Sequence, residues 1–177
     1  MSTFKSTLLT NRDATPKVLT DAFLSGGMTT ESIGSVNMTG AAAAGTAMKL
    51  VSVPSNARIT DLSWQADGLG SSTRLDLAVW YPTAIPTGGA NFLASGSSGV
   101  ILASSIFAAN LAPADTATAI TSITNQSTNY LIALQETPLW NVLGFTADPE
   151  ISFDLGFTIR VANINSGYVG LKAKYIF

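Results

Sequence analysis

Asp148 and Glu150 form the pair of side chains whose type and spacing come closest to a catalytic site. Two carboxylates can act as general acid and base on a glycosidic bond, and carboxylates with backbone carbonyls can bind calcium. Pro149 stiffens the segment, but the surrounding sequence supplies few further oxygen ligands. A polar loop in front of a strand explains the same residues, so we predict neither a catalytic residue nor a metal site.

Several common kinds of site are excluded by the residues that the chain lacks. It has no histidine, which removes the commonest general base and the Ser-His-Asp arrangement. It has no cysteine, so there is neither a thiol nucleophile nor a Cys/His zinc site. No phosphate-binding loop or dinucleotide fingerprint is present, and the glycines of Asp67-Gly68-Leu69-Gly70 are typical of a turn between strands. We therefore predict no cofactor.

The large aromatic side chains are the remaining candidates for ligand binding. Trp64, Trp80, Trp140, Tyr81 and Tyr130 could together form a platform that stacks on sugars, although aromatics at every second position more often belong to a core or an interface. Trp80 lies on the strand face opposite the apolar side chains. It is therefore expected either in a second buried layer or at a subunit contact.

The overall composition indicates a protein that hides apolar surface in a core and against partner subunits. The chain is 46% hydrophobic and 11% charged, whereas soluble domains average about 25% charged residues. No apolar run approaches the length of a membrane helix, and no polybasic patch suggests a membrane surface. The nine basic residues are scattered, so no nucleic-acid partner is predicted. Low charge favours a homo-oligomer instead.

Residues 1–45 differ from the rest of the chain and are predicted to form an extended N-terminal arm. Short apolar pieces alternate there with Thr, Ser, Asn and Gly, and the segment is too sparse in apolar residues for a core of its own. The arm could pack on its own domain or dock on a neighbouring subunit. The predicted partner-binding residues are Phe4, Leu8, Leu9, Val18, Leu19 and Phe23 in the arm, together with Trp80.

Residues 46–177 are predicted to form one antiparallel β-sandwich. Apolar and polar residues alternate without a break over 151–161, which is typical of a half-buried strand. The last segment, 169–177, alternates too, and the turn-forming residues between the two predict a hairpin. An apolar phase slip at Leu50/Val51 predicts a bulge. The other predicted strands are 48–53, 58–65, 75–81, 100–106, 117–123 and 129–135.

One or two short helices are also expected. Thr137 is suited to an N-cap, Pro138 to the first helical position and Gly144 to the stop. Leu139, Val142 and Leu143 would then face the core. A second helix could lie near 104–111. Several short strands separated by regular turns indicate a sandwich, jelly roll or barrel.

Three pieces of sequence, in this order, resemble a family of structural proteins encoded in tailed-bacteriophage genomes. The first is the arm, from Lys5 to Gly27. The second runs from Leu50 to Ile59, followed by Asp67–Gly70 and the strand Leu75–Tyr81. The third is Pro138–Phe145, followed by Asp148-Pro149, a long alternating strand and the closing strand to Phe177. Together they cover most of the chain, and residues 83–135 match least.

This resemblance implies a virion protein with a jelly-roll-like fold and no catalytic motif. Its implied role is that of a decoration or cement protein on the major capsid protein lattice, with a trimer as the first expectation for its oligomeric state. The implied location is the capsid surface, after synthesis in the host cytoplasm. The absence of cysteine and of a signal-peptide core at the N-terminus fits this expectation.

The sequence leaves other functions open. The chain could be a tail, fibre or head-spike component, a carbohydrate-binding or receptor-binding module on the same particle, or an enzyme that uses carboxylates alone. Under the decoration hypothesis, removal of residues 1–40 is expected to leave a folded domain that binds its lattice poorly.

Overall fold

The computed structural model of the chain describes residues 29–38, 42–82, 101–113, 119–123, 132–162 and 165–177. These residues form two four-stranded antiparallel sheets. In spatial order, the first sheet contains β1 (Thr30–Met38), β8 (Gly167–Ile176), β3 (Arg58–Ala66) and β6 (Thr121–Ser122). The second contains β2 (Ala47–Pro54), β7 (Ser152–Val161), β4 (Arg74–Trp80) and β5 (Ile101–Leu111). Two short helices, α2 (Ile132–Gln135) and α3 (Leu139–Val142), precede β7.

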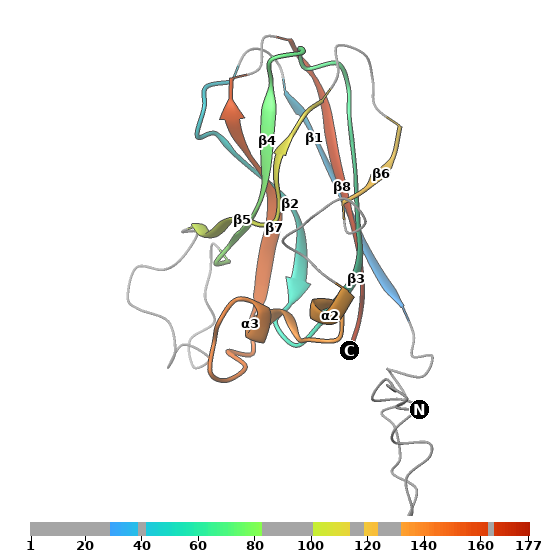
Figure 1. Cartoon of the computed structure of the whole chain (residues 1–177), viewed down its shortest axis with the longest axis vertical. Coiled ribbons are helices and arrows are strands. Elements are labelled where there is room, and N and C mark those ends of the chain that lie inside the picture. Colours follow the sequence, from blue (N-terminus) through green and yellow to red (C-terminus); the bar gives the residue numbers. More distant parts are fainter. Residues whose placement is uncertain (1–28, 39–41, 83–100, 114–118, 124–131, 163–164) are drawn as a thin grey trace, which may run out of the picture.

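The order of the strands is that of a jelly roll. β1 pairs with β8, β2 with β7, β3 with β6 and β4 with β5, all antiparallel, so the chain resembles one long hairpin wrapped into two layers. Further pairs between β3 and β8 and between β4 and β7 complete the sheets. This arrangement of eight strands is the double-sheet architecture of jelly rolls. The predicted all-β antiparallel sandwich is confirmed (Figure 1).

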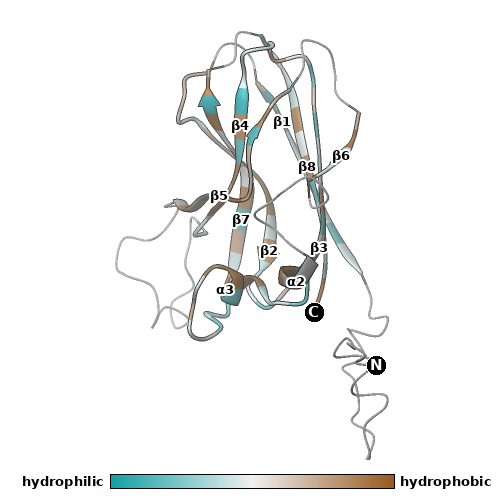
Figure 2. Cartoon of the chain, viewed as in Figure 1, coloured by the Kyte–Doolittle hydropathy of each residue, from teal (hydrophilic) through white to brown (hydrophobic). Residues whose placement is uncertain are grey.

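The core lies between the two sheets and is built by alternation. In β7, Phe153, Leu155, Phe157 and Ile159 point inward and are fully buried, while the residues between them face away. Figure 2 shows the alternation as brown and pale bands along the strands. The rings of Trp64 and Phe157 lie 5.9 Å apart and join the layers through the middle of the core.

Residues 30–38 belong to the sandwich, so the predicted boundary at residue 45 is wrong. β1 pairs with β8 over its whole length, from Thr30 opposite Tyr175 to Met38 opposite Gly167. Its inward positions carry small or modest side chains, which gave the segment little apolar signal. Whether residues 1–28 form an extended arm stays a prediction, because they lie outside the described residues.

The second sheet approaches β1 closely, and small residues make this approach feasible. A Cβ atom on Gly34 would lie 1.9 Å from the carbonyl oxygen of Leu50. Leu50 is the bulged residue of β2, because the register with β7 shifts between Lys49 and Val51. The bulge predicted at this point is therefore confirmed. A bulge bends its strand, and here the bent part of β2 lies under β1.

The predicted hairpin between 151–161 and 169–177 is wrong, although both strands exist. β7 belongs to the second sheet and β8 to the first. Alternation determines which face of a strand is buried, but it carries no information about which strand lies beside it. In a jelly roll, strands that follow each other in sequence often cross from one sheet to the other.

Two further predictions fail at short apolar segments. The helix considered near 104–111 is strand β5, whose register with β4 is repeatedly shifted. The strand predicted at 129–135 is helix α2 over residues 132–135, with 129–131 outside the described residues. A short apolar run fits a buried helix and a buried strand equally well. The other strands are confirmed over the described residues; of the predicted 117–123, β6 contains Thr121–Ser122, and residues 117–118 lie outside the described residues.

Candidate functional site

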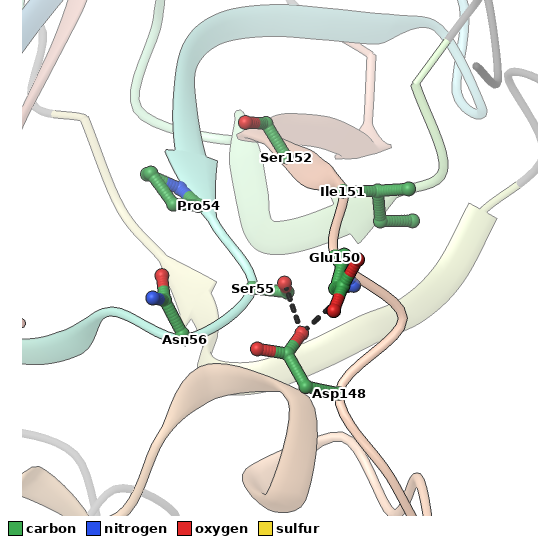
Figure 3. A pocket seen from close by; sticks show the side chains of 7 residues that line it. All are labelled: Pro54, Ser55, Asn56, Asp148, Glu150, Ile151 and Ser152. Atoms are coloured by element: carbon green, nitrogen blue, oxygen red, sulfur yellow. Dashed lines mark hydrogen bonds between the residues drawn. The ribbon is translucent and has the colours of Figure 1, made fainter. Parts of the chain in front are cut away.

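The carboxylate pair lies in a polar cleft at the end of the sandwich that holds α2, α3 and the C-terminus (Figure 1). The cleft has a volume of about 380 Å³ and is lined by Pro54, Ser55, Asn56, Asp148, Glu150, Ile151 and Ser152. Figure 3 shows that the Ser55 hydroxyl and the Glu150 backbone both point at the Asp148 carboxylate. Ser55 Oγ donates to Asp148 Oδ1 at 2.5 Å, and the Glu150 N–H donates to the same oxygen at 2.9 Å.

The start of α3 holds the opposite wall of this cleft in place. The N–H of Leu139 donates to the Ala57 carbonyl and that of Trp140 to the Ser55 carbonyl, at 2.8 and 2.9 Å. These bonds satisfy donors that a helix leaves unpaired at its first turn. Pro138 therefore takes the N-cap position predicted for Thr137, and no side-chain cap is present. Gly144, at φ +85°, ends the helix as predicted.

The geometry gives Asp148 a structural task in this cleft. Its Oδ1 atom bridges the β2–β3 loop, through Ser55, and the segment that enters β7, through the Glu150 N–H. Glu150 is exposed and its backbone has φ +54°, a conformation that the Asp148 bond stabilises. The two carboxylates thus differ in role: one ties loops together and the other faces solvent. This is the arrangement of a polar loop, as the simpler sequence interpretation predicts.

Replacing Asp148 is expected to loosen the cleft. Ser55 is 2% exposed, so Asp148→Ala leaves a buried hydroxyl without its acceptor, at a cost of about 1–3 kcal/mol in the free energy of unfolding. Glu150→Gln, which keeps the backbone N–H, is the matched control and should change that free energy by less than about 0.5 kcal/mol. Chemical denaturation of both variants measures this difference. Equal effects of the two substitutions would contradict the assigned role of Asp148.

In the described part of the chain, no group of three or more His, Cys, Asp or Glu side chains could hold a metal ion. None of its helices has the length and apolar character needed to cross a membrane.

Among the described residues, the aromatic platform suggested by the sequence does not form. Trp64 and Trp80 are 5% and 3% exposed, so neither offers a ring face to a ligand. The Tyr81 ring packs near Phe145 and Phe153, and burial raises the pKa of the Tyr81 hydroxyl. Trp140 is half-buried. Tyr130 lies outside the described residues.

Trp80 is buried, with 3% of its surface exposed. It lies on the outer side of the second sheet, where Ala78 and Gly156 are buried as well. Lys49 covers this part of the sheet: its Nζ atom lies 6.0 Å from the Trp80 ring centroid and 3.2 Å from Asp154 Oδ2. A partner contact of Trp80 stays a prediction.

The six predicted partner-binding residues of the arm lie outside the described residues. A surface that the sequence did not predict lies along β1 and β8. On the outer face of the first sheet, Ile33, Ile120 and Tyr168 are 72%, 67% and 57% exposed. Ile33 is out of phase with Val36 and Met38, and Tyr168 with Val169, so alternation could have identified both once β1 and β8 were paired.

Comparisons with known proteins give little similarity. No protein-family model matches the chain, and no curated protein matches it. Among solved structures, the chain is similar to one described as the cyanophage Pam1 capsid asymmetric unit, with 16% sequence identity, a TM-score of 0.41 and 86% of each chain covered. At that identity and TM-score, the likeness determines neither the fold nor the function of this chain.

Proposed function

We propose that the protein is a non-enzymatic structural component of a bacteriophage virion, and specifically a decoration or cement protein of the head. In this proposal it binds the major capsid protein lattice as a homo-oligomer, with a trimer as the first expectation. The arm residues Phe4, Leu8, Leu9, Val18, Leu19 and Phe23 make the partner contacts. The protein carries no cofactor and acts by adding contact area between capsid subunits.

The observation that carries the proposal is the jelly-roll strand order. The best catalytic candidate of the chain, Asp148, instead holds two loops together through hydrogen bonds. Jelly rolls occur in viral capsid and lectin domains. The lectin alternative loses support because Trp64 and Trp80 are buried. The phage-family resemblance of the sequence supports the virion role independently of the fold.

The physical requirements of a cement protein agree with these features. Such a protein needs a rigid core, apolar surface and a segment long enough to contact a neighbouring subunit, but no reactive groups. At about 25 cal/mol per Å² of apolar surface, an arm that buries a few hundred Å² contributes several kcal/mol before the cost of ordering it. Repetition of the contact over a lattice multiplies weak affinities.

The location on the particle tests the proposal most directly. An antibody raised against this chain, detected with gold by electron microscopy, should label purified particles over the whole head and in many copies. Label confined to the tail or to one vertex would contradict decoration and favour the tail, fibre or head-spike alternative. Absence of the protein from purified heads would overturn the proposal.

Deletion of the arm tests how the protein binds. A variant without residues 1–28 retains every described strand, so we expect it to unfold at an unchanged denaturant concentration and to bind undecorated heads at least about tenfold more weakly. A deletion of residues 1–40 removes β1 as well, so it should unfold the sandwich, contrary to the sequence-based expectation. Loss of folding on removal of 1–28 would make the arm part of the core instead.

A further inference from the structure

Two adjoining hollows cross the outer face of the first sheet and meet at Gly170. One has a volume of about 220 Å³ and lies beside Tyr168, Asp67 and Ser35; the other, about 230 Å³, lies beside Ile33, Ile120 and Lys172. Gln65 and Gly170 line both. Together they form a groove, named here the Gly170 groove, that contains three of the large hydrophobic side chains exposed on the described surface. Contiguous exposed apolar groups of this kind mark interaction sites.

The glycine at the centre of the groove is not required by the backbone. Gly170 lies within β8, and a Cβ atom placed on it would make ordinary contacts, the nearest at 3.7 Å. Glycine inside a strand weakens the strand and often marks a point where a ligand or another backbone approaches closely. Here the missing side chain keeps the floor of the groove open. Gly34, by contrast, has no room for a Cβ atom.

Among the described residues, none covers the groove. Ile33, Ile120 and Tyr168 stay highly exposed, so a segment of another molecule has access to them. The distance between the two ends of the groove indicates which segment fits it. Lys172 and Tyr168 mark the two ends on β8, four residues apart, which is about 13 Å in a strand.

An extended segment with two apolar side chains four residues apart has the same spacing, and the arm contains one. Leu19 and Phe23 would lie on one face of an extended segment, with Asp21 between them. Asp21 would then lie over Gly170, where Ser35, Gln65 and Lys172 offer a hydroxyl, an amide and an ammonium group as donors. The segment matches the groove in spacing, and the Lys172 ammonium carries the charge opposite to that of Asp21; Asp67, which also lines the first hollow, accepts a hydrogen bond from the Tyr168 N–H.

We propose that the Gly170 groove binds the arm segment Leu19–Phe23 of a neighbouring copy of this chain. Leu19 and Phe23 fill the two hollows, one each, and the Asp21 carboxylate lies at the centre. This inference rests on the proposed function for its purpose, since it identifies how copies are linked on a head. Its chemistry, however, concerns the chain alone and can be tested without a virion.

The native chain has no cysteine, so a disulfide trap is specific. Full-length Asp21→Cys and Gly170→Cys chains, carrying different tags, are mixed and oxidised. We expect a covalent dimer that contains both tags, whichever way the segment runs. Gly170→Cys is replaced in the control by Ala47→Cys, an exposed position on the second sheet, and this pair should not be trapped. Equal trapping at Ala47, or no trapping at Gly170, would overturn the inference.

A single chain that carries both cysteines separates this arrangement from an arm folded back on its own domain. At high dilution, rapid closure within the monomer would overturn the inference. Charge reversal provides a second measurement: Lys172→Glu and Asp21→Lys should each weaken self-association by about fivefold, and the double variant should restore it. If the antibody labels heads but no disulfide forms, the proposed function stands without this contact. If the disulfide forms but heads are not labelled, the contact between copies stands without the proposed function.

Discussion

Gly34→Ala is expected to lower the free energy of unfolding by about 3 kcal/mol or more. The added methyl carbon would lie 1.9 Å from the Leu50 carbonyl oxygen, 2.7 Å from its carbonyl carbon and 3.3 Å from its Cα. All three are backbone atoms of a bulged strand, so no side chain can rotate away. Relief requires β1 to move from β2, which also strains its pairing with β8. Overpacking in a core typically costs about 1–3 kcal/mol and sometimes more.

Gly170→Ala is the matched control, because it adds the same atom to a glycine in a paired strand. Its new methyl carbon would meet the Gly34 carbonyl oxygen at 3.7 Å, which is an ordinary contact. Removing a strand glycine should therefore leave the protein unchanged or more stable by up to about 1 kcal/mol. Urea denaturation compares the two variants through their midpoints at constant slope. Similar destabilisation of both would show that the close approach of β1 and β2 is not rigid.

Gly34 also explains why the sequence does not predict β1. β1 places Ser32, Gly34, Val36 and Met38 inward, and most of these are too small to give an apolar period of two. The strand is selected by the space left above the β2 bulge rather than by its own hydrophobicity, which is a tertiary effect that propensity does not contain. β7 is the opposite case, since its four inward positions Phe153, Leu155, Phe157 and Ile159 are all large and apolar.

The candidate site was predictable to a similar, partial extent. The loop character of Asp148-Pro149-Glu150 followed from its residue types, whereas the partner of Asp148, Ser55, lies 93 residues away in sequence and gave no local signal. The Gly170 groove was hidden for the same reason. Its lining comes from β1, β3 and β8 and from the segment before β6. Its apolar side chains can be recognised as one surface only after the order of the strands in the sheet is known.

Phe157→Ala is expected to have an effect as large as that of Gly34→Ala, but by creating a cavity. Phe157 is fully buried, its ring lies 5.9 Å from that of Trp64 on the facing sheet, and it pairs across the strands with Met48 and Leu77. Truncation of a buried phenylalanine costs about 3–5 kcal/mol. Because β7 is central in its sheet, the neighbouring strands cannot collapse into the space without losing their register.

Val161→Ala is the control for this substitution, as it shortens a side chain at the end of the same strand. Val161 is exposed, and its truncation should change the free energy of unfolding by less than about 0.5 kcal/mol. Loss of the Trp64–Phe157 contact should also change the tryptophan fluorescence of the folded Phe157→Ala protein, which Val161→Ala leaves unaltered. A stability loss below about 1.5 kcal/mol would mean that the two sheets close over the missing ring and that the core is less tightly packed than its alternation indicates.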